Sequence, residues 1–282
     1  MHTHRGRFGV TGCAARSLAV GVSLLVAAAS AAALEGDVDH GAWDELAERH
    51  VEAGLVNYEG LAQDHATLDH YLGTLAEADV AVLPSDAARL AFWTNAYNAC
   101  AARLVLDRLP LSSVRDAKGF FDRARCRVAG EEHTLREIAD AGRALGDWRF
   151  LFAAACPAVG CPPMRSEAYT AEWLDAQLDD QVTVFLANPR DGLRADDSAL
   201  WVSPLFKRHA EDIVGRKLTA EALLAVLEPY LQADVLERVR GRKLKVKLLR
   251  QNWLLNAMVA GRLASPGTSS PPRVAGPPAR SP

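Results

Sequence analysis

The sequence predicts an α+β fold, in which helices lead into a small mixed or antiparallel sheet within a single domain. Apolar residues recur with helical spacing in the first part of the chain, and shorter segments typical of strands follow later. No linker-like composition interrupts residues 34–264. The apolar share of 49% and the charged share of 24% are those of an ordinary soluble protein, which argues against gross disorder and against a multi-span membrane protein.

The expected helices follow from apolar spacing and capping residues. Residues 43–53 and 66–75 each place apolar side chains on one face. A long helix should begin at Ser85-Asp86, where a serine N-cap follows Pro84. Because apolar residues occupy nearly its whole circumference, we expect this helix to be central and buried. Further helices are expected over residues 136–144, 170–186 and 220–231.

A hairpin is expected between the long helix and the helix that follows it. Residues 124–128 and 133–135 flank a turn at Gly130-Glu131. Cys126 should be a strand residue of this hairpin, whereas Cys100 should be a core residue of the long helix.

Three further segments have strand character. The apolar run at 150–155 is bounded by Asp147 and Pro157 and predicts a short buried strand. Residues 201–203 predict another short strand. Residues 243–248 alternate lysine with apolar residues, a pattern that favours a half-buried edge strand.

The two ends differ from this domain in composition. Residues 1–33 carry three arginines and no acid ahead of an apolar run that ends in Ala31-Ala32-Ala33, which is the pattern of a cleaved secretory signal peptide. The alternative is an uncleaved anchor, although the run is a little short of the roughly 20 residues that a bilayer span needs. Residues 265–282 contain six prolines and no apolar run, and they predict a disordered tail.

Charge bears on the expected partners. The chain has 32 basic and 35 acidic residues, and removal of residues 1–33 leaves 29 against 35, a net charge of −6. This balance gives no electrostatic reason to expect nucleic-acid binding. No second long apolar stretch follows the signal. We therefore expect an exported protein, periplasmic or extracellular, with no membrane span after cleavage, whose partner is an unknown ligand or protein.

Two cysteines form the most informative pair in the expected mature chain. Cys156 and Cys161 lie five positions apart, directly after the expected strand at 150–155. A disulfide is the interpretation we favour in an oxidising compartment. A reactive thiol, its pKa lowered by Arg149 or Arg165, is the alternative. Zinc is disfavoured because the remaining histidines show no paired arrangement, so we expect no metal, and no cofactor is indicated.

The long helix carries two amides and two amphipathic aromatic residues in an otherwise apolar sequence. Asn95 and Asn98 need hydrogen-bond partners if they are buried, so they either tie the helix to neighbouring backbone or orient a group in a pocket. The first interpretation is the simpler one, with Trp93 and Tyr97 filling the core.

Two histidines could serve as the base of a thiol mechanism. Such a mechanism needs an imidazole within hydrogen-bond reach of the cysteine and a third group that orients it. His133 lies in the hairpin and His209 follows a basic stretch. An isolated histidine is more often a surface or capping residue.

Three motifs give the chain its family resemblance. They are Phe92-Trp93-Thr94-Asn95-Ala96-Tyr97-Asn98-Ala99, Cys156-Pro157-Ala158-Val159-Gly160-Cys161-Pro162-Pro163 followed by Arg165, and Asn252-Trp253-Leu254-Leu255-Asn256-Ala257. With shorter matching pieces between them, they span about Leu55 to Ala257. In these motifs the chain resembles the uncharacterised family called domain of unknown function 547. The resemblance implies no settled activity.

One position departs from the family pattern. The family commonly has histidine two residues after the arginine that is Arg149 here, and this chain has Leu151. A histidine five residues before Cys156 would favour a thiol hydrolase. Its loss favours a binding role on an inactive hydrolase-like scaffold.

Three hypotheses result. The first is ligand or partner binding in a pocket between the long helix, the loop from Cys156 to Arg165 (the cysteine loop) and the segment from Asn252 to Asn256. Its expected binding residues are Trp93, Tyr97, Asn98, Arg149, Arg165, Lys207, Asn252, Trp253 and Asn256. The second is a thiol-dependent hydrolase or transferase acting on amide or ester bonds, with Cys156 or Cys161 as nucleophile, His209 or His133 as base and Asn95 as orienter or oxyanion donor. The third is a purely structural domain that carries a disulfide.

Overall fold

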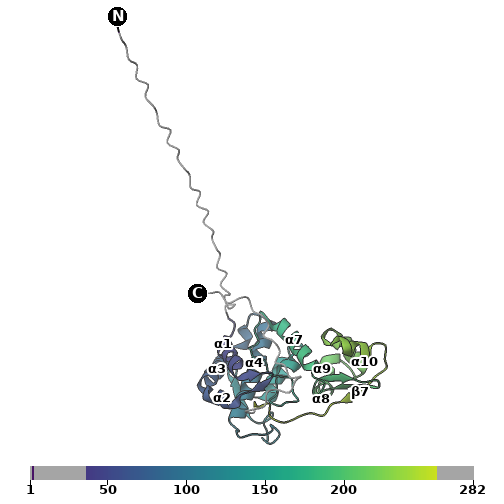
Figure 1. The fold of residues 1–282 in the computed structure, drawn as a ribbon. Helices are drawn as coiled ribbons and strands as arrows, with labels where there is room; N and C mark the ends of the chain where they lie inside the picture. The colour runs from purple at the N-terminus through teal and green to yellow at the C-terminus, as the bar shows by residue number, and fades with distance from the viewer. Residues whose placement is uncertain (1, 3–35, 259–282) are drawn as a thin grey trace. The chain divides into compact units, whose positions relative to one another are not determined.

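The computed structural model describes residue 2 and residues 36–258 (Figure 1). The expected signal peptide at 1–33 and the expected tail at 265–282 lie outside the described residues. Within them the fold is α+β, as the sequence predicts, with many helices and small sheets of two or three strands. No helix in this part of the chain is long and apolar enough to cross a membrane.

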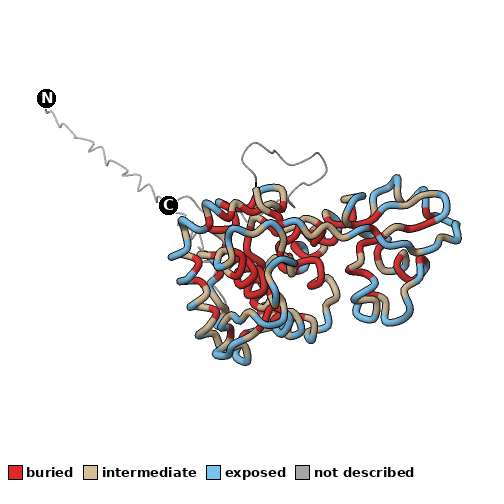
Figure 2. The backbone as a smooth tube through the Cα atoms, turned by 90° about the horizontal axis from the view of Figure 1, so that it is seen from below, coloured by how far each residue is buried: buried red, intermediate tan, exposed pale blue. Residues whose placement is uncertain are grey.

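A long buried helix forms the centre of the first part of the fold. Helix α4 (Asp86–Leu106) begins at the predicted N-cap, where the Ser85 hydroxyl accepts a hydrogen bond from Ala88 N–H at 3.0 Å. Most of its residues are buried, and Figure 2 shows buried backbone gathered in the interior. The preceding elements are α1 (Gly41–His50), β1 (Val51–Glu52), β2 (Leu55–Val56), α2 (Tyr58–Gln63), α3 (His65–Glu77) and the short 3-10 helix η1 (Val80–Val82).

The first helix ends earlier than the sequence predicts. Helix α1 stops at His50, and the chain turns from β1 into β2 through Ala53 and Gly54, both with positive φ. A Cβ at Gly54 would lie 2.4 Å from Pro163 Cβ, so the turn also needs glycine for space. The expected helix over 43–53 is therefore wrong in its last three residues, where the tight turn replaces helical bonding.

The predicted hairpin and its following helix are present. Strand β3 (Arg125–Val128) pairs antiparallel with β4 (Glu131–Thr134), and α5 (Leu135–Arg143) follows at once. Thr134 and Glu137 form a reciprocal capping box at the start of α5.

The segment expected as a buried strand at 150–155 is a short helix, α6 (Phe150–Ala153). The Asp147 carboxylate accepts a hydrogen bond from Arg149 N–H at 2.9 Å, which begins a helical turn. All four residues of α6 are buried, so their apolar run could not reveal a period. Phe150 packs over Gly142 of α5, where a Cβ would come within 2.4 Å of the ring.

The later part of the fold contains the predicted mixed sheet. Strand β5 (Leu193–Ala195) pairs antiparallel with β6 (Ala199–Val202), and β6 pairs parallel with β7 (Lys245–Leu248). Strand β7 is the edge strand predicted from its lysines, but it is mostly exposed rather than half-buried, because only Val246 is partly covered. The helices of this part are α7 (Leu174–Leu186), α8 (Pro204–Arg208), α9 (Ala210–Val214), α10 (Ala220–Leu227), the 3-10 helix η2 (Glu228–Tyr230) and α11 (Ala233–Val239).

After β7 the chain returns to the first part of the fold as the returning segment (residues 249–258). Ala257 bridges to Val56 of β2, and Leu254 bridges to Ser113. The same segment accepts backbone hydrogen bonds from the cysteine loop. The returning segment therefore contacts β2, the region of Ser113 and the cysteine loop, which are far apart in sequence.

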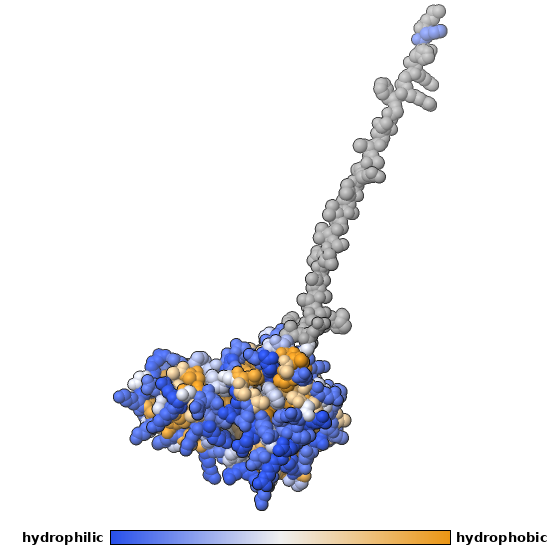
Figure 3. All heavy atoms as spheres, turned by 180° about the vertical axis from the view of Figure 1, so that it is seen from behind, coloured by the Kyte–Doolittle hydropathy of each residue, from blue (hydrophilic) through white to orange (hydrophobic). Residues whose placement is uncertain are grey.

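A disulfide between Cys100 and Cys126 joins α4 to β3, 26 residues later. The sequence places one cysteine in the core and the other in a strand, but it does not predict their bond. On the face drawn in Figure 3 the described surface is mainly hydrophilic, with apolar residues gathered in a few patches.

Candidate ligand-binding site

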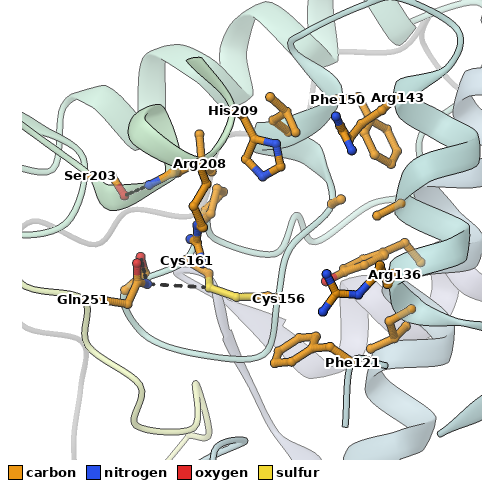
Figure 4. A pocket seen from close by; sticks show the side chains of 18 of the residues that line it. Phe121, Arg136, Arg143, Phe150, Cys156, Cys161, Ser203, Arg208, His209 and Gln251 are labelled. Atoms are coloured by element: carbon orange, nitrogen blue, oxygen red, sulfur yellow. Dashed lines mark hydrogen bonds between the residues drawn. A yellow bond between two sulfur atoms is a disulfide. The ribbon is translucent and has the colours of Figure 1, made fainter. Parts of the chain in front are cut away.

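A pocket of about 480 Å³ opens where α4, α5, the cysteine loop, α8 and the returning segment meet (Figure 4). This volume lies within the range of small-molecule sites. Five of the residues singled out in the sequence line it: Tyr97, Cys156, Cys161, His209 and Trp253.

The cysteine loop forms one wall of the pocket. Cys156 and Cys161 are disulfide-bonded, in agreement with the favoured interpretation of the sequence. Hydrogen bonds with the returning segment fix the position of the cysteine loop. Gly160 N–H donates to Asn252 O at 2.9 Å, and Gln251 Nε2 donates to Gly160 O at 2.7 Å. Neither sulfur is therefore a free thiol that could act as a nucleophile.

The other walls are largely apolar. Phe121, Leu135, Phe150 and Leu151 line the pocket, together with Trp253 from the returning segment. Leu151 thus lies in the wall itself, at the position where the family commonly has histidine. An apolar wall with a few polar groups is the usual composition of a small-molecule site.

Tyr97 is the polar residue that α4 contributes to the pocket. The side chain is almost completely buried, and this burial raises the pKa of its phenol well above the usual value, although the nearby Arg208 cation lowers it in part. Tyr97 therefore stays a neutral hydrogen-bonding group at neutral pH.

Cationic and imidazole side chains supply the remaining polarity. Arg136 and Arg143 extend from α5, and Arg208 and His209 come from the end of α8 (Figure 4). His209 Nδ1 lies 3.2 Å from the Asp212 carboxylate. Burial, and to a lesser extent the charges of Arg143 and Arg208, lower the pKa of His209 despite that carboxylate. The imidazole is therefore mainly neutral at pH 7.

The two amides of α4 contact backbone. Asn95 Nδ2 donates to Tyr169 O at 2.7 Å, and its Oδ1 accepts from Tyr169 N–H at 2.9 Å. Asn98 Nδ2 donates to Ala153 O at 3.1 Å, and its Oδ1 accepts from Ala155 N–H at 2.9 Å. Both side chains thus tie α4 to the segments around α6 and the loop that follows it, and neither lines the pocket.

Two arginines expected near the cysteine loop bind carboxylates. Arg149 forms ion pairs with Asp147, Asp175 and Asp179. These carboxylates hold the pKa of Arg149 above its usual value, against the opposing effect of burial.

Arg165 is almost fully buried and forms ion pairs with Glu167 and Asp180, each at 2.6 Å. Neither Arg149 nor Arg165 lines the pocket. Removal of Arg165 would leave the carboxylates of Glu167 and Asp180 charged in buried or partly buried surroundings.

The remaining expected residues lie outside the pocket. Trp93 contacts His133 edge to face, with ring centroids 6.0 Å apart, and Lys207 is exposed. Asn252 Oδ1 accepts from Leu254 N–H, while buried Asn256 accepts from the Tyr58 hydroxyl at 2.8 Å. These asparagines shape the returning segment. Among the described residues, no group of three or more His, Cys, Asp or Glu side chains could hold a metal ion.

Sequence reasoning missed several pocket residues, namely Phe121, Arg136, Arg143, Phe150 and Arg208. One signal could have found part of this set. Arg136, Ala139 and Arg143 recur at spacings of three and four, so they share one face of α5. Arg136 is exposed and Arg143 is partly buried, so this face lies at the edge of the core, where the small side chain of Ala139 between the two arginines leaves space for a cavity.

The fold and the site define an α+β protein with an apolar pocket that is edged by cations and bounded by a disulfide loop. Residues 83–186 match the family described as "Protein of unknown function, DUF547", which supports the resemblance indicated by the motifs. The match contains the first two motifs, whereas α8 and the returning segment lie beyond it. No curated protein and no solved structure matches the chain.

Proposed function

We propose that this chain is an exported domain that binds a small ligand in the pocket, on a scaffold like that of a hydrolase but without its activity. The observation that carries the proposal is the pocket itself: an apolar cavity of about 480 Å³ in which a few polar groups converge. Its two cysteines are bonded to each other, so the cavity offers shape and charge without a free nucleophile.

A plugged pocket tests ligand binding. Ala139 and Ala154 both line the pocket, and Ala139→Trp or Ala154→Trp would place a large ring in the cavity. The probe is the uncharged fluorophore N-phenyl-1-naphthylamine, and the matched control is Ala144→Trp, because Ala144 is exposed at the end of α5 and does not line the pocket.

We expect the wild type and the control to bind the fluorophore and both plugged variants to lose at least about tenfold in affinity at unchanged melting temperature. Equal binding by all four proteins, or binding by none, would favour the purely structural hypothesis.

Export is supported by the composition of residues 1–33 and by the two disulfides, because disulfides persist in oxidising compartments. The test is N-terminal sequencing of the full chain recovered from the periplasm or the medium. The expected first residue is Leu34. Recovery of an intact N-terminus from the membrane fraction would instead support the uncleaved anchor.

A thiol-dependent hydrolase is the alternative, and one observation favours it: Cys156, Cys161 and His209 line the same pocket. This chemistry requires the disulfide to be reduced first. An electrophilic ester or amide probe should then label one cysteine of the reduced protein, and Cys156→Ala or Cys161→Ala should abolish that labelling. Absence of labelling under reducing conditions would exclude the alternative.

A further inference from the structure

We propose that the ligand of this pocket is an organic anion, with a carboxylate or sulfonate head and an apolar body. This inference rests on the proposed ligand-binding function and specifies the chemical class of the ligand. It rests on the charge of the lining, on the pairing of the cationic groups and on the apolar surface beside them.

The charge of the lining has a single sign. Three arginines and one histidine line the pocket, and no aspartate or glutamate does. The protein as a whole is acidic, with a net charge of −3 over the full chain, so this concentration of cations is local. Arginine is the side chain best suited to carboxylate recognition, because its planar guanidinium can donate two parallel hydrogen bonds.

The lining arginines differ in whether they already form ion pairs with carboxylates. Arg143 is already bound to Asp140 at 2.8 Å and to Asp212 at 2.9 Å, and His209 contacts the same Asp212. Within residues 36–258, neither Arg136 nor Arg208 forms an ion pair with a carboxylate. Arg136 and Arg208 are therefore the cations that an incoming anion can neutralise.

Figure 4 shows how these two side chains lie. Arg208 extends from the end of α8 toward Cys161, and Arg136 extends from α5 toward Cys156, so both guanidinium groups approach the disulfide. Arg208 is exposed over part of its surface, and the desolvation of the rest lowers the pKa of its guanidinium. An anion bound here would offset that cost.

The apolar wall defines the rest of the ligand. Phe121, Leu135, Phe150 and Trp253 surround the same cavity and can accept an aromatic ring or an aliphatic chain. A free inorganic anion would leave this surface in contact with water, and a neutral apolar molecule would gain nothing from the two guanidinium groups, which are partly exposed to water. An amphiphilic organic anion satisfies both parts of the pocket.

A pair of probes tests this inference on the intact protein. 8-Anilinonaphthalene-1-sulfonate carries the ring system of N-phenyl-1-naphthylamine plus one sulfonate. We expect the sulfonate probe to bind more tightly than the neutral probe. We also expect Arg136→Gln and Arg208→Gln each to weaken sulfonate binding by about tenfold, the effect of losing one charge-assisted hydrogen bond, with neutral-probe binding unchanged.

The matched control is Lys207→Gln: Lys207 and Arg208 are neighbouring exposed cations, but only Arg208 lines the pocket. Arg208→Lys keeps the charge and should retain part of the affinity that Arg208→Gln loses. Equal losses of sulfonate affinity in Lys207→Gln and Arg208→Gln would mean that only the net positive charge near the pocket matters, and they would overturn the inference.

Tight binding of the neutral probe with no preference for the sulfonate would also overturn the inference, while the proposed ligand-binding function would stand. Failure of both probes to bind the wild type would overturn both.

Discussion

A methyl group at Gly160 should detach the cysteine loop from the returning segment and damage the pocket. A Cβ at this position would lie 2.6 Å from Asn252 N and 2.8 Å from Asn252 O. Both are backbone atoms, so no side chain can rotate away to make room. The φ of Gly160 is not positive, and space is therefore what requires glycine here.

The cost of Gly160→Ala can be worked from the bonds at this contact. Gly160 N–H donates to Asn252 O at 2.9 Å, Gln251 Nε2 donates to Gly160 O at 2.7 Å, and Val159 N–H donates to Leu254 O at 2.9 Å. At about 1 kcal/mol for each bond, their loss lowers the free energy of unfolding by about 2 to 4 kcal/mol. Gln251 also lines the pocket, so ligand affinity should fall as well.

Urea denaturation measures the stability change, and titration with N-phenyl-1-naphthylamine measures the affinity. The matched control is Gly73→Ala in α3, where a Cβ would have no neighbour within 4 Å. Alanine in a helix interior should raise stability there by about 0.5 to 1 kcal/mol. If Gly160→Ala matched the wild type in both stability and affinity, this account of the close contact would be refuted.

Three further predictions concern α4, the disulfide and a buried histidine. Asn95→Ala should lower the free energy of unfolding by about 1 to 3 kcal/mol without changing probe affinity, and loss of binding at unchanged melting temperature would show instead that the amide serves the pocket. Iodoacetamide should not alkylate Cys156 or Cys161 in the native protein until a reductant is added, and rapid native alkylation would contradict the bond. Burial lowers the pKa of His40 from 6.5 to about 4, so stability is full above pH 6.5 and falls as the pH drops toward 4, by up to about 3 kcal/mol. In His40→Gln, urea denaturation across that pH range should show a smaller fall, and an equal fall in both proteins would exclude His40 as its source.

The features best predicted from the sequence were those that local chemistry determines. The Ser85 cap, the apolar circumference of α4 and the Gly130 turn each act within a few residues, and α4 and the β3–β4 hairpin lie where those signals place them. The lysine alternation of β7 likewise reflects one exposed edge. The run at 150–155 was predicted wrongly because four buried residues carry no period, and the Asp147 turn decided the outcome.

The sequence singles out Tyr97, the cysteine loop and Trp253, which line the pocket, but seven of the nine expected binding residues lie outside it. The sequence did not predict the arginines of the pocket, because α5 and α8 are far apart in the chain and only tertiary packing brings Arg136, Arg143 and Arg208 to one cavity. The bond between Cys100 and Cys126 was missed for the same reason, since a disulfide across elements depends on tertiary contact. Asn95 and Asn98 show the converse: their type indicated specific partners, but only the fold reveals that these partners are backbone groups.

The most direct test of ligand binding in this pocket is an amide NMR titration of the protein with 8-anilinonaphthalene-1-sulfonate. We expect saturable shifts that cluster at the pocket residues Gly160, Cys161, Ser203 and Arg208. Shifts centred instead on the surface of α10 and α11, or no saturable shifts at all, would contradict it.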